Sequence, residues 1–487
     1  MLKQYLFHSI FGEIFWLILF LSFPSSLFLL GKFKSKINKK LYYVVEYLIF
    51  STPLILYIYY TFPGIYLPDT VSQLKQASNG VYTDWHPPLM SAFMAILINY
   101  FDTPTSLYWI LACLYLVGWT TFFIVFKINS LSDLSTYVFS ICFALVGLTL
   151  FGVILKDIFV AYSLFAATGL LALSIALQNR TGYALLPVGI LIFLAIISRH
   201  NAFPAVLPIL FILFYRCFSK NRFSALWSML LVFACSVSLH ILIKTITYES
   251  LGTQKWNIQH AIMLHDLSYY ENKYNIIIIP ENYRRENYNK YHLSESLNNL
   301  NCDFIINNRI NPNAPYKVLR SVDDKTIDNL WFSTILKNPF PYIWHRLLVY
   351  ANFLSLGNNK PWHFYYPSGN SDILMEKNDI IVENRFPKSI IVEHMISKSL
   401  SLVGRLLPIY LGWFWLLINI LLVFISAYKL NQNAYAQLAF SISLSGLVYF
   451  LFYVIIAPCP SFRYFYWPIL ACISSLFLLQ ISKARNA

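Results

Sequence analysis

Apolar runs of about 20 residues recur along the whole chain, and this repetition restricts its fold more than any other feature. A helical run of that length crosses the roughly 30 Å hydrocarbon core of a bilayer. The composition agrees, because only 12% of the residues are charged, whereas soluble domains carry about 25%. The sequence therefore predicts an all-α polytopic membrane protein, with spans expected near 12–31, 42–62, 106–126, 135–155, 158–177, 182–199, 202–216, 224–244, 407–427, 434–457 and 464–482.

Positive charge between the runs sets the expected topology. The segment "KFKSKINKK" (32–40) has five lysines in nine residues, and such clusters face the cytoplasm. Alternate later connections also carry Lys and Arg, provided that the short run 89–101 does not cross and forms a re-entrant or surface-lying helix. The prediction is about eleven spans with the N-terminus outside. The net charge of +14 then follows from this bias, and nucleic acid is not expected as a partner.

The chain divides into three predicted parts. Residues 1–244 form an N-terminal membrane core whose first outer loop is 63–105, and residues 401–487 form C-terminal membrane helices. Between them, 245–400 is hydrophilic but rich in aromatic residues, so it is expected to be a small folded outer domain, α-rich or α/β. The first apolar run lacks a cationic start and a cleavage site, so we expect a retained helix. The seven cysteines show no metal-binding spacing.

Polar and ionisable residues gather at the predicted outer junctions between spans. Such groups are costly at membrane depth and usually face a cavity or a partner. Together they predict a polar cavity open to the outer side. The residues are Asp69, Gln73, Asp84 and His86 in "YLPDTVSQLKQASNGVYTDWHPPLMS", Lys156 and Asp157 in "ILKDIF", Arg199, His200 and Asn201 in "SRHNAF", and Arg463 after "PCPSF".

Each of these residues also has a purely structural interpretation. Asp69 is a favoured residue type for a helix cap, and His86 before two prolines would shape a turn. Lys156 and Asp157 would form an interface-level ion pair, while Arg199 would reach towards lipid phosphates and Arg463 would anchor a helix end. No single residue decides between the two interpretations, and their shared location is the stronger signal.

A cavity of this kind suits chemistry on a lipid-linked sugar phosphate. Arg and Lys bind the phosphate that carries the leaving-group charge, and a carboxylate accepts the proton of the attacking hydroxyl. Nucleotide sugars are absent outside the cell membrane, and the sequence has neither a P-loop nor a dinucleotide-binding glycine motif. The residues therefore favour a transferase that uses a sugar carried on a lipid phosphate.

The order of features resembles the GT-C superfamily of membrane glycosyltransferases, over roughly 42–216 and more loosely over the final three spans. The resemblance implies an essential first-loop acid, which matches Asp69 in "YLPDTVSQ", although the motif "PDT…DWHPP" leaves Asp84 as the alternative base. A later acid would match Asp157. Some branches use a divalent metal and others do not. The expected catalytic residues are Asp69, Asp84 and His86, the phosphate-binding cations are Lys156, Arg199 and Arg463, and the supporting polar residues are Gln73, Asp157, His200 and Asn201.

Length and layout are also similar to the phage-type glucosyltransferases that convert O-antigen serotype. That narrower resemblance implies undecaprenyl-phosphate glucose as donor, a lipopolysaccharide O-antigen acceptor, and a donor synthase and a flippase as partner proteins. It also implies the bacterial inner membrane with a site facing the periplasm. The insert would then bind the acceptor, with candidate stacking residues at Trp256, Trp331, Trp344 and Trp362, for which core packing or interface anchoring is the competing explanation.

Two other functions remain open at this point. An O-antigen or capsule polymerase would act on lipid-diphosphate oligosaccharides and would place its key arginines in outer loops. A glycolipid transporter would show charged or broken positions near the middle of paired spans, and the spans here are largely free of mid-depth charge. The Asp-led first loop favours the single-sugar transferase.

Overall fold

The computed structural model describes residues 39–62, 64–101, 105–129, 133–143, 150, 152–178, 182–199, 201–217, 224–286, 288–319, 325–356 and 408–486. Among these residues, five helices are long and apolar enough to cross a membrane. The chain is therefore an all-α membrane protein in its described part, and the count of eleven spans remains a prediction. The expected span 12–31 lies outside the described residues. The five helices are Thr105–Ile128, Lys156–Ala176, Ala225–Ser250, Ala434–Ile456 and Phe462–Ala484.

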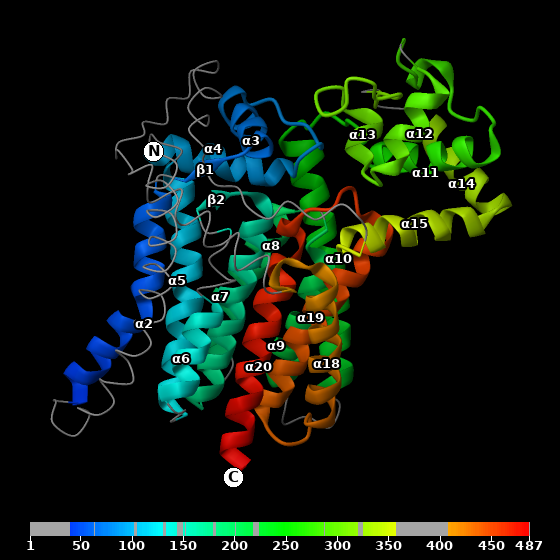
Figure 1. Ribbon diagram of the computed structural model, residues 1–487. Helices are drawn as coiled ribbons and strands as arrows, with labels where there is room; N and C mark the ends of the chain where they lie inside the picture. The colour runs from blue at the N-terminus through cyan, green and yellow to red at the C-terminus, as the bar shows by residue number, and fades with distance from the viewer. Residues whose placement is uncertain are drawn as a thin grey trace, which may run out of the picture.

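The helices form an upright bundle (Figure 1). Helix α7 (Lys156–Ala176) is its centre, since 83% of its apolar 18-residue stretch is buried inside the protein. It packs against α5, α8 and α20. The surrounding helices are α2 (Lys39–Thr61), α5 (Thr105–Ile128), α6 (Asp133–Cys142), α8 (Gly182–Ser198), α9 (Phe203–Cys217), α10 (Ser224–Lys244), α18 (Gly412–Tyr428), α19 (Ala434–Ile456) and α20 (Tyr466–Asn486).

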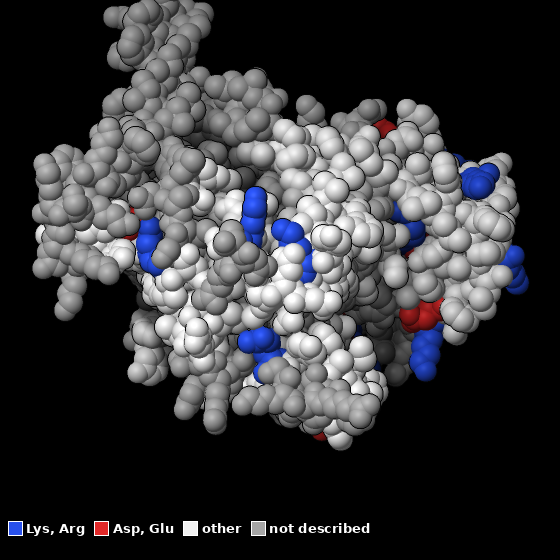
Figure 2. All heavy atoms as spheres, turned by 90° about the horizontal axis from the view of Figure 1, so that it is seen from below, with Lys and Arg blue, Asp and Glu red and all other residues white. Residues whose placement is uncertain are grey.

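Two short helices, α3 (Pro68–Asn79) and α4 (Pro88–Phe101), lie across the upper end of the bundle (Figure 1). With 14 residues, α4 is shorter than the roughly 20 residues that a span needs. At the opposite end, the last turns of α5 and α9 carry Lys127 and Arg216. Figure 2 shows Lys and Arg side chains spread over the face seen from below. The positions of Lys127 and Arg216 fit the charge bias used for the predicted topology, and the orientation in a membrane remains a prediction.

The predicted span 135–155 differs from the structure. Helix α6 ends at Cys142, and Val153–Ile154 form the strand β2 instead of the end of a helix. Gly152 precedes that strand with a φ of +85°, and a Cβ at this position would collide with Thr61. Glycine adopts this left-handed conformation without strain and leaves room for Thr61 where the chain enters the strand.

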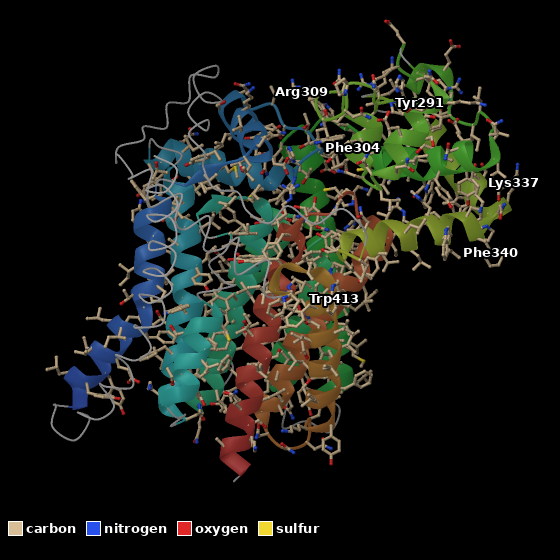
Figure 3. The ribbon with its side chains drawn as sticks, viewed as in Figure 1. Tyr291, Phe304, Arg309, Lys337, Phe340 and Trp413 are labelled. Carbon is tan, nitrogen blue, oxygen red and sulfur yellow. The ribbon has the colours of Figure 1, made fainter. Side chains whose placement is uncertain are left out.

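The insert is helical and has its own hydrophobic core at the side of the bundle's upper end (Figure 1). That core contains Leu264, Leu267, Tyr283, Ile305 and Tyr316. Figure 3 shows Lys337 and Phe340 at its outer tip and Arg309 on the side nearest α3. The helices are the π-helix η2 (Thr245–Ser250), α11 (Gln259–Tyr274), η3 (Glu281–Tyr283), α12 (Lys290–Asn298), α13 (Cys302–Ile306), α14 (Thr326–Lys337) and α15 (Pro339–Phe353), and 357–400 lie outside the described residues.

Contacts at the end of α19 hold the insert against the bundle. The backbone N–H of Cys302 donates to the carbonyl oxygen of Pro458 at 2.8 Å. The ring of Phe353, at the end of α15, stacks on Tyr453 and meets Phe465 edge-on, each with 4.7 Å between centroids. The insert therefore stands at a fixed place beside the upper junctions of the bundle.

Candidate functional site

A two-stranded parallel sheet brings the first loop and the start of α7 together. Strand β1 (Ile65–Tyr66) pairs with β2 (Val153–Ile154), with Tyr66 opposite Ile154. Parallel strands leave a sheet in the same direction, so α3 and α7 begin side by side. Asp69 lies in the first turn of α3, and its Oδ2 is 3.6 Å from Nζ of Lys156, the first residue of α7.

Arg463 joins this pair from the last junction of the bundle. It lies in the short helix η5 (Phe462–Phe465), just before α20. Its Nη1 donates to Asp69 Oδ2 at 3.0 Å, and its Nε is 3.7 Å from Asp157 Oδ2. One guanidinium thus bridges the acids of α3 and α7. The side chains of Asp69, Arg463 and Lys156 remain 30%, 16% and 12% exposed.

Arg199 forms the inner part of the same cluster. It follows α8, pairs with the buried Asp157, and donates from Nε to the side-chain oxygen of Asn201. Its guanidinium lies 4.5 Å from the centroid of the Tyr464 ring. Asn201 in turn donates to the hydroxyl of Tyr453 at 3.0 Å. His200, a further predicted residue, lies outside the described residues. Arg199 therefore holds Asp157, and its predicted role as a phosphate ligand stays a prediction.

His86 and Gln73 complete the surroundings of Asp69. The Lys156 ammonium donates to Nδ1 of His86, with 2.8 Å between the two nitrogens. Gln73, one helical turn after Asp69, is 1% exposed, and neither atom of its amide has a hydrogen-bond partner within the described part of the chain. The structure thus places His86 in direct contact with a cation of the cluster, and Gln73 is buried one turn further along α3.

The other first-loop acid, Asp84, has a different environment. Its Oδ1 accepts the backbone N–H of Trp256 at 2.6 Å, and its Oδ2 accepts the Tyr248 hydroxyl at 3.3 Å. The adjacent backbone pairs with the insert as well, because Thr83 forms a bridge with Gln254. Asp84 therefore fastens the first loop to the insert. Of the two candidate bases, the structure brings only Asp69 to the cations.

The electrostatics of the cluster keep Asp69 ionised. Burial alone would raise the pKa of this carboxyl, but the charges of Lys156 and Arg463, followed by those of His86 and Arg199, hold it well below its usual range. Three cations (Lys156, Arg199 and Arg463) face the two acids Asp69 and Asp157. The cluster consequently carries an excess of positive charge, as an anion-binding site requires.

Consecutive residues at the end of the first loop line two cavities. The polar cavity, of about 770 Å³, has Asp69, Trp85 and His86 on the core side and Trp256 and Asp303 among the insert residues that line it. The apolar groove, of about 1220 Å³, begins at the next residues, Pro87–Leu89, and continues between α9, α10 and α19.

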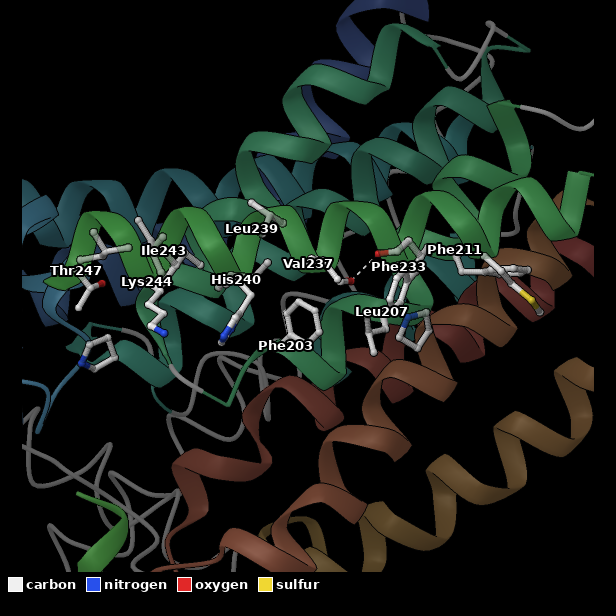
Figure 4. A pocket seen from close by; sticks show the side chains of 18 of the residues that line it. Phe203, Leu207, Phe211, Phe233, Val237, Leu239, His240, Ile243, Lys244 and Thr247 are labelled. Atoms are coloured by element: carbon white, nitrogen blue, oxygen red, sulfur yellow. Dashed lines mark hydrogen bonds between the residues drawn. The ribbon is translucent and has the colours of Figure 1, made fainter. Parts of the chain in front are cut away.

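The apolar groove is lined mainly by aliphatic and aromatic side chains. Figure 4 shows Phe203 and Leu207 of α9 beside Phe233 and Val237 of α10. Polar side chains gather towards the end of α10, where His240, Lys244 and Thr247 contribute to the lining. The groove is therefore apolar along most of its length and polar where it approaches the first loop.

Several lining residues of the polar cavity were not predicted from the sequence. These are Asp303 and the cations Arg285, Arg309 and Lys317, all from the insert. Of the predicted tryptophans, only Trp256 lines the cavity, whereas Trp331 donates to the buried Asp266 at 2.9 Å and Trp344 is exposed on α15. Trp362 lies outside the described residues. In a hydrophilic segment, no single polar residue stands out by contrast with its neighbours.

No metal site is evident in the part of the chain that the structure describes, since no group of three or more His, Cys, Asp or Glu side chains is placed to hold an ion. Compared with known proteins, the chain matches no family model, no curated protein and no solved structure. The function is therefore argued from the geometry of the two cavities and the ion cluster.

Proposed function

We propose that the protein is a membrane glycosyltransferase that moves a single hexose from a polyprenyl-phosphate donor to a glycan or lipid acceptor. The observation that carries the proposal is that consecutive residues of the first loop line the two cavities, His86 the polar cavity and Pro87–Leu89 the apolar groove. A ligand for both must have a long apolar tail and a polar, anionic head. A polyprenyl-phosphate sugar has this form, and its tail would lie in the groove.

The ion cluster supplies the groups that such a donor requires. Lys156 and Arg463 would bind the phosphate and stabilise the charge that develops on it as the bond to the sugar breaks. Both cations pair with Asp69. Asp69 would hold both cations in position beside the phosphate.

In the transfer step, the acceptor hydroxyl oxygen attacks the anomeric carbon, and the bond from that carbon to the phosphate oxygen breaks. The hydroxyl proton passes to a carboxylate of the polar cavity, and polyprenyl phosphate leaves. Asp69 is the candidate base that the sequence provides. By the narrower resemblance, the sugar is glucose and the acceptor O-antigen, at the periplasmic face of a bacterial inner membrane, with a donor synthase and a flippase as partners.

One observation favours a second candidate function. The cations Arg285, Arg309 and Lys317 line the polar cavity from the insert, and outer-loop cations are what a polymerase of lipid-diphosphate oligosaccharides would use. The mass of the surface glycan in cells with and without the gene separates the two functions. A gain of one hexose per repeat unit supports the transferase, and a change in chain length alone supports the polymerase.

The direct test is the Asp69→Asn variant, assayed in vesicles with a labelled polyprenyl-phosphate hexose and acceptor glycan. We expect transfer to fall by about 10²–10⁴-fold, the range of general acid–base catalysis, while the protein stays folded and inserted in the membrane. Asn has nearly the same shape but can neither accept the proton nor pair with two cations. Near-normal transfer by this variant would remove Asp69 from the mechanism.

A further inference from the structure

The insert contributes a second carboxylate to the polar cavity, Asp303. The backbone hydrogen bond from Cys302 to Pro458 fixes the start of α13 against the turn that leads to Arg463. The next residue, Asp303, lines the polar cavity together with Asp69 and His86. Two carboxylates, one from the core and one from the insert, thus border one cavity.

These two carboxylates have opposite surroundings. Asp69 pairs with Lys156 and Arg463. Within the described part of the chain, the Asp303 carboxylate takes part in no hydrogen bond or ion pair, although its backbone N–H donates to Asn301 at 2.9 Å. Burial, followed by the nearby Asp69 charge, raises the pKa of Asp303, and Arg463 only partly opposes this. Paired carboxylates with divergent environments indicate separate roles in acid–base chemistry.

We propose that Asp303 is the group that accepts the proton of the acceptor hydroxyl, while Asp69 stays ionised and holds Lys156 and Arg463 in place. This assignment rests on the proposed glycosyl transfer. The acceptor O–H bond breaks and its proton goes to Asp303, the new bond joins that oxygen to the anomeric carbon, and the bond to the phosphate oxygen breaks. The electron pair of that last bond leaves with polyprenyl phosphate.

Asp303 is better placed than Asp69 to contact the acceptor. The acceptor must enter from the side away from the apolar groove, and there the insert forms the wall. Trp85 and Trp256 line the same cavity and offer aromatic surfaces on which a sugar ring stacks. A base also works best with a pKa close to the working pH. A carboxylate held by two cations is a weak proton acceptor, and an unpaired, partly desolvated one is stronger.

The test uses azide, an anionic nucleophile that has no proton to lose. Azide attacks the anomeric carbon, the bond to phosphate breaks, and a glycosyl azide forms without a base. For Asp303→Asn we expect transfer to the hydroxyl acceptor to fall by about 10²–10⁴-fold, with azide-dependent consumption of the donor close to that of the wild type. Asp69→Asn should lose both reactions, because its change disturbs the phosphate-binding cations.

Three outcomes would overturn the assignment: near-normal hydroxyl transfer by Asp303→Asn, loss of its azide reaction, or azide rescue of Asp69→Asn instead. Asp303→Ser, which is smaller and also cannot act as the base, guards against a local folding defect and must behave in the same way. Transfer to the hydroxyl acceptor that is higher in Asp303→Glu than in Asp303→Asn would further support a role for the carboxylate. Failure of the proposed function is distinct, because the wild type itself would then consume no polyprenyl-phosphate hexose with either nucleophile.

The pH profile gives a second readout. The titratable and charged groups around Asp303 are Asp69 on α3, Arg463 and Cys459 beside the last junction, His86 in the first loop, and Cys302, Arg285, Arg309 and Lys317 in the insert. Transfer to a hydroxyl should decline on the acid side as Asp303 becomes protonated. When rates are expressed per concentration of ionised azide, which itself takes up a proton in acid, the azide reaction of Asp303→Asn should lack this decline, and a decline of the same size would contradict the assignment.

Discussion

Two carboxylate–guanidinium pairs in this protein have nearly the same geometry and opposite surroundings. Asp69 and Arg463 are 3.0 Å apart at the edge of the polar cavity, and Asp266 and Arg346 are 2.7 Å apart inside the insert. The Asp69 side chain is 30% exposed, whereas that of Asp266 is 1% exposed. An ion pair by itself therefore says little about function. What distinguishes the first pair is an open side and additional cations.

The Asp266 pair is a structural connection. Arg346 also donates to the carbonyl oxygens of Ala457 and Ile262, at 3.4 and 3.3 Å, and so links the insert to the end of α19. The charge of Asp266 is balanced by that of Arg346, so the pair is close to neutral. No positive charge remains to bind a ligand anion. A buried pair of this kind is costly to break, because the remaining charge is left without compensation.

Replacing the arginine by glutamine should lower stability in the Asp266 pair and impair donor use in the Asp69 pair. The larger effect is expected for Arg346→Gln. It leaves Asp266 buried with Trp331 as its nearest hydrogen-bond donor. We expect the free energy of unfolding to fall by about 3–5 kcal/mol, seen as a lower melting temperature and faster proteolysis of the insert. The control Arg309→Gln, at an exposed position, should change stability by less than about 0.5 kcal/mol. An unchanged melting temperature for Arg346→Gln would contradict the structural role.

Arg463→Gln should keep its fold and lose donor use. After the change, Asp69 retains Lys156 and Asp157 retains Arg199, so no buried charge is left alone. We expect transfer at low donor concentration to fall by about 10²-fold, which corresponds to roughly 2.7 kcal/mol at 1.36 kcal/mol per factor of ten. The apparent affinity for the acceptor should change little. An unchanged apparent affinity for the donor would count against a phosphate-binding role.

Acid should destabilise the insert around the Asp266–Arg346 pair, where Nε2 of the buried His345 lies 3.6 Å from Oδ1 of Asp266. Burial, and to a lesser degree the Arg346 charge, lowers the pKa of His345 to about 3, from about 6.5 in an unfolded chain. The unfolded state therefore binds more protons below pH 6.5, and stability falls as the pH drops from there towards 3. Between pH 7 and pH 5 this residue alone should cost about 2 kcal/mol. Melting curves at the two pH values measure the loss, and His345→Gln should reduce the difference.

The sequence predicted those parts of the molecule that contrast with an apolar background. Asp69, Lys156, Asp157, Arg199 and Arg463 stand out against long apolar runs, and the structure brings them into one cluster. Their catalytic and binding roles remain predictions. The coarse fold followed from the same contrast, because a helix is the simplest way to satisfy the backbone of an apolar run in lipid.

The remaining features lacked such a contrast. The strands β1 and β2 have two residues each, too few to show the alternation that indicates a strand, yet their pairing is what aligns Asp69 with Lys156. Asp303 and Asp266 lie in a hydrophilic insert where acids are common. Whether such an acid is buried, paired or open to a cavity depends on contacts between segments far apart in the chain, which no local pattern records.

The smallest expected effect concerns Asp84, the acid that the sequence could not separate from Asp69. Asp84→Asn keeps a side-chain oxygen for the N–H of Trp256 and loses the acceptor for the Tyr248 hydroxyl. One lost hydrogen bond at a partly buried site should cost about 1 kcal/mol of stability, and transfer should stay within a few-fold of the wild type. The rate of limited proteolysis in the first loop and in the insert measures the loosened contact between them. Since Asp69→Asn makes the same chemical change fifteen residues earlier, the two variants form a matched pair. A loss of transfer by Asp84→Asn as large as that of Asp69→Asn would place Asp84 at the chemistry, and the role of the first loop as a clamp on the insert would then have to be abandoned.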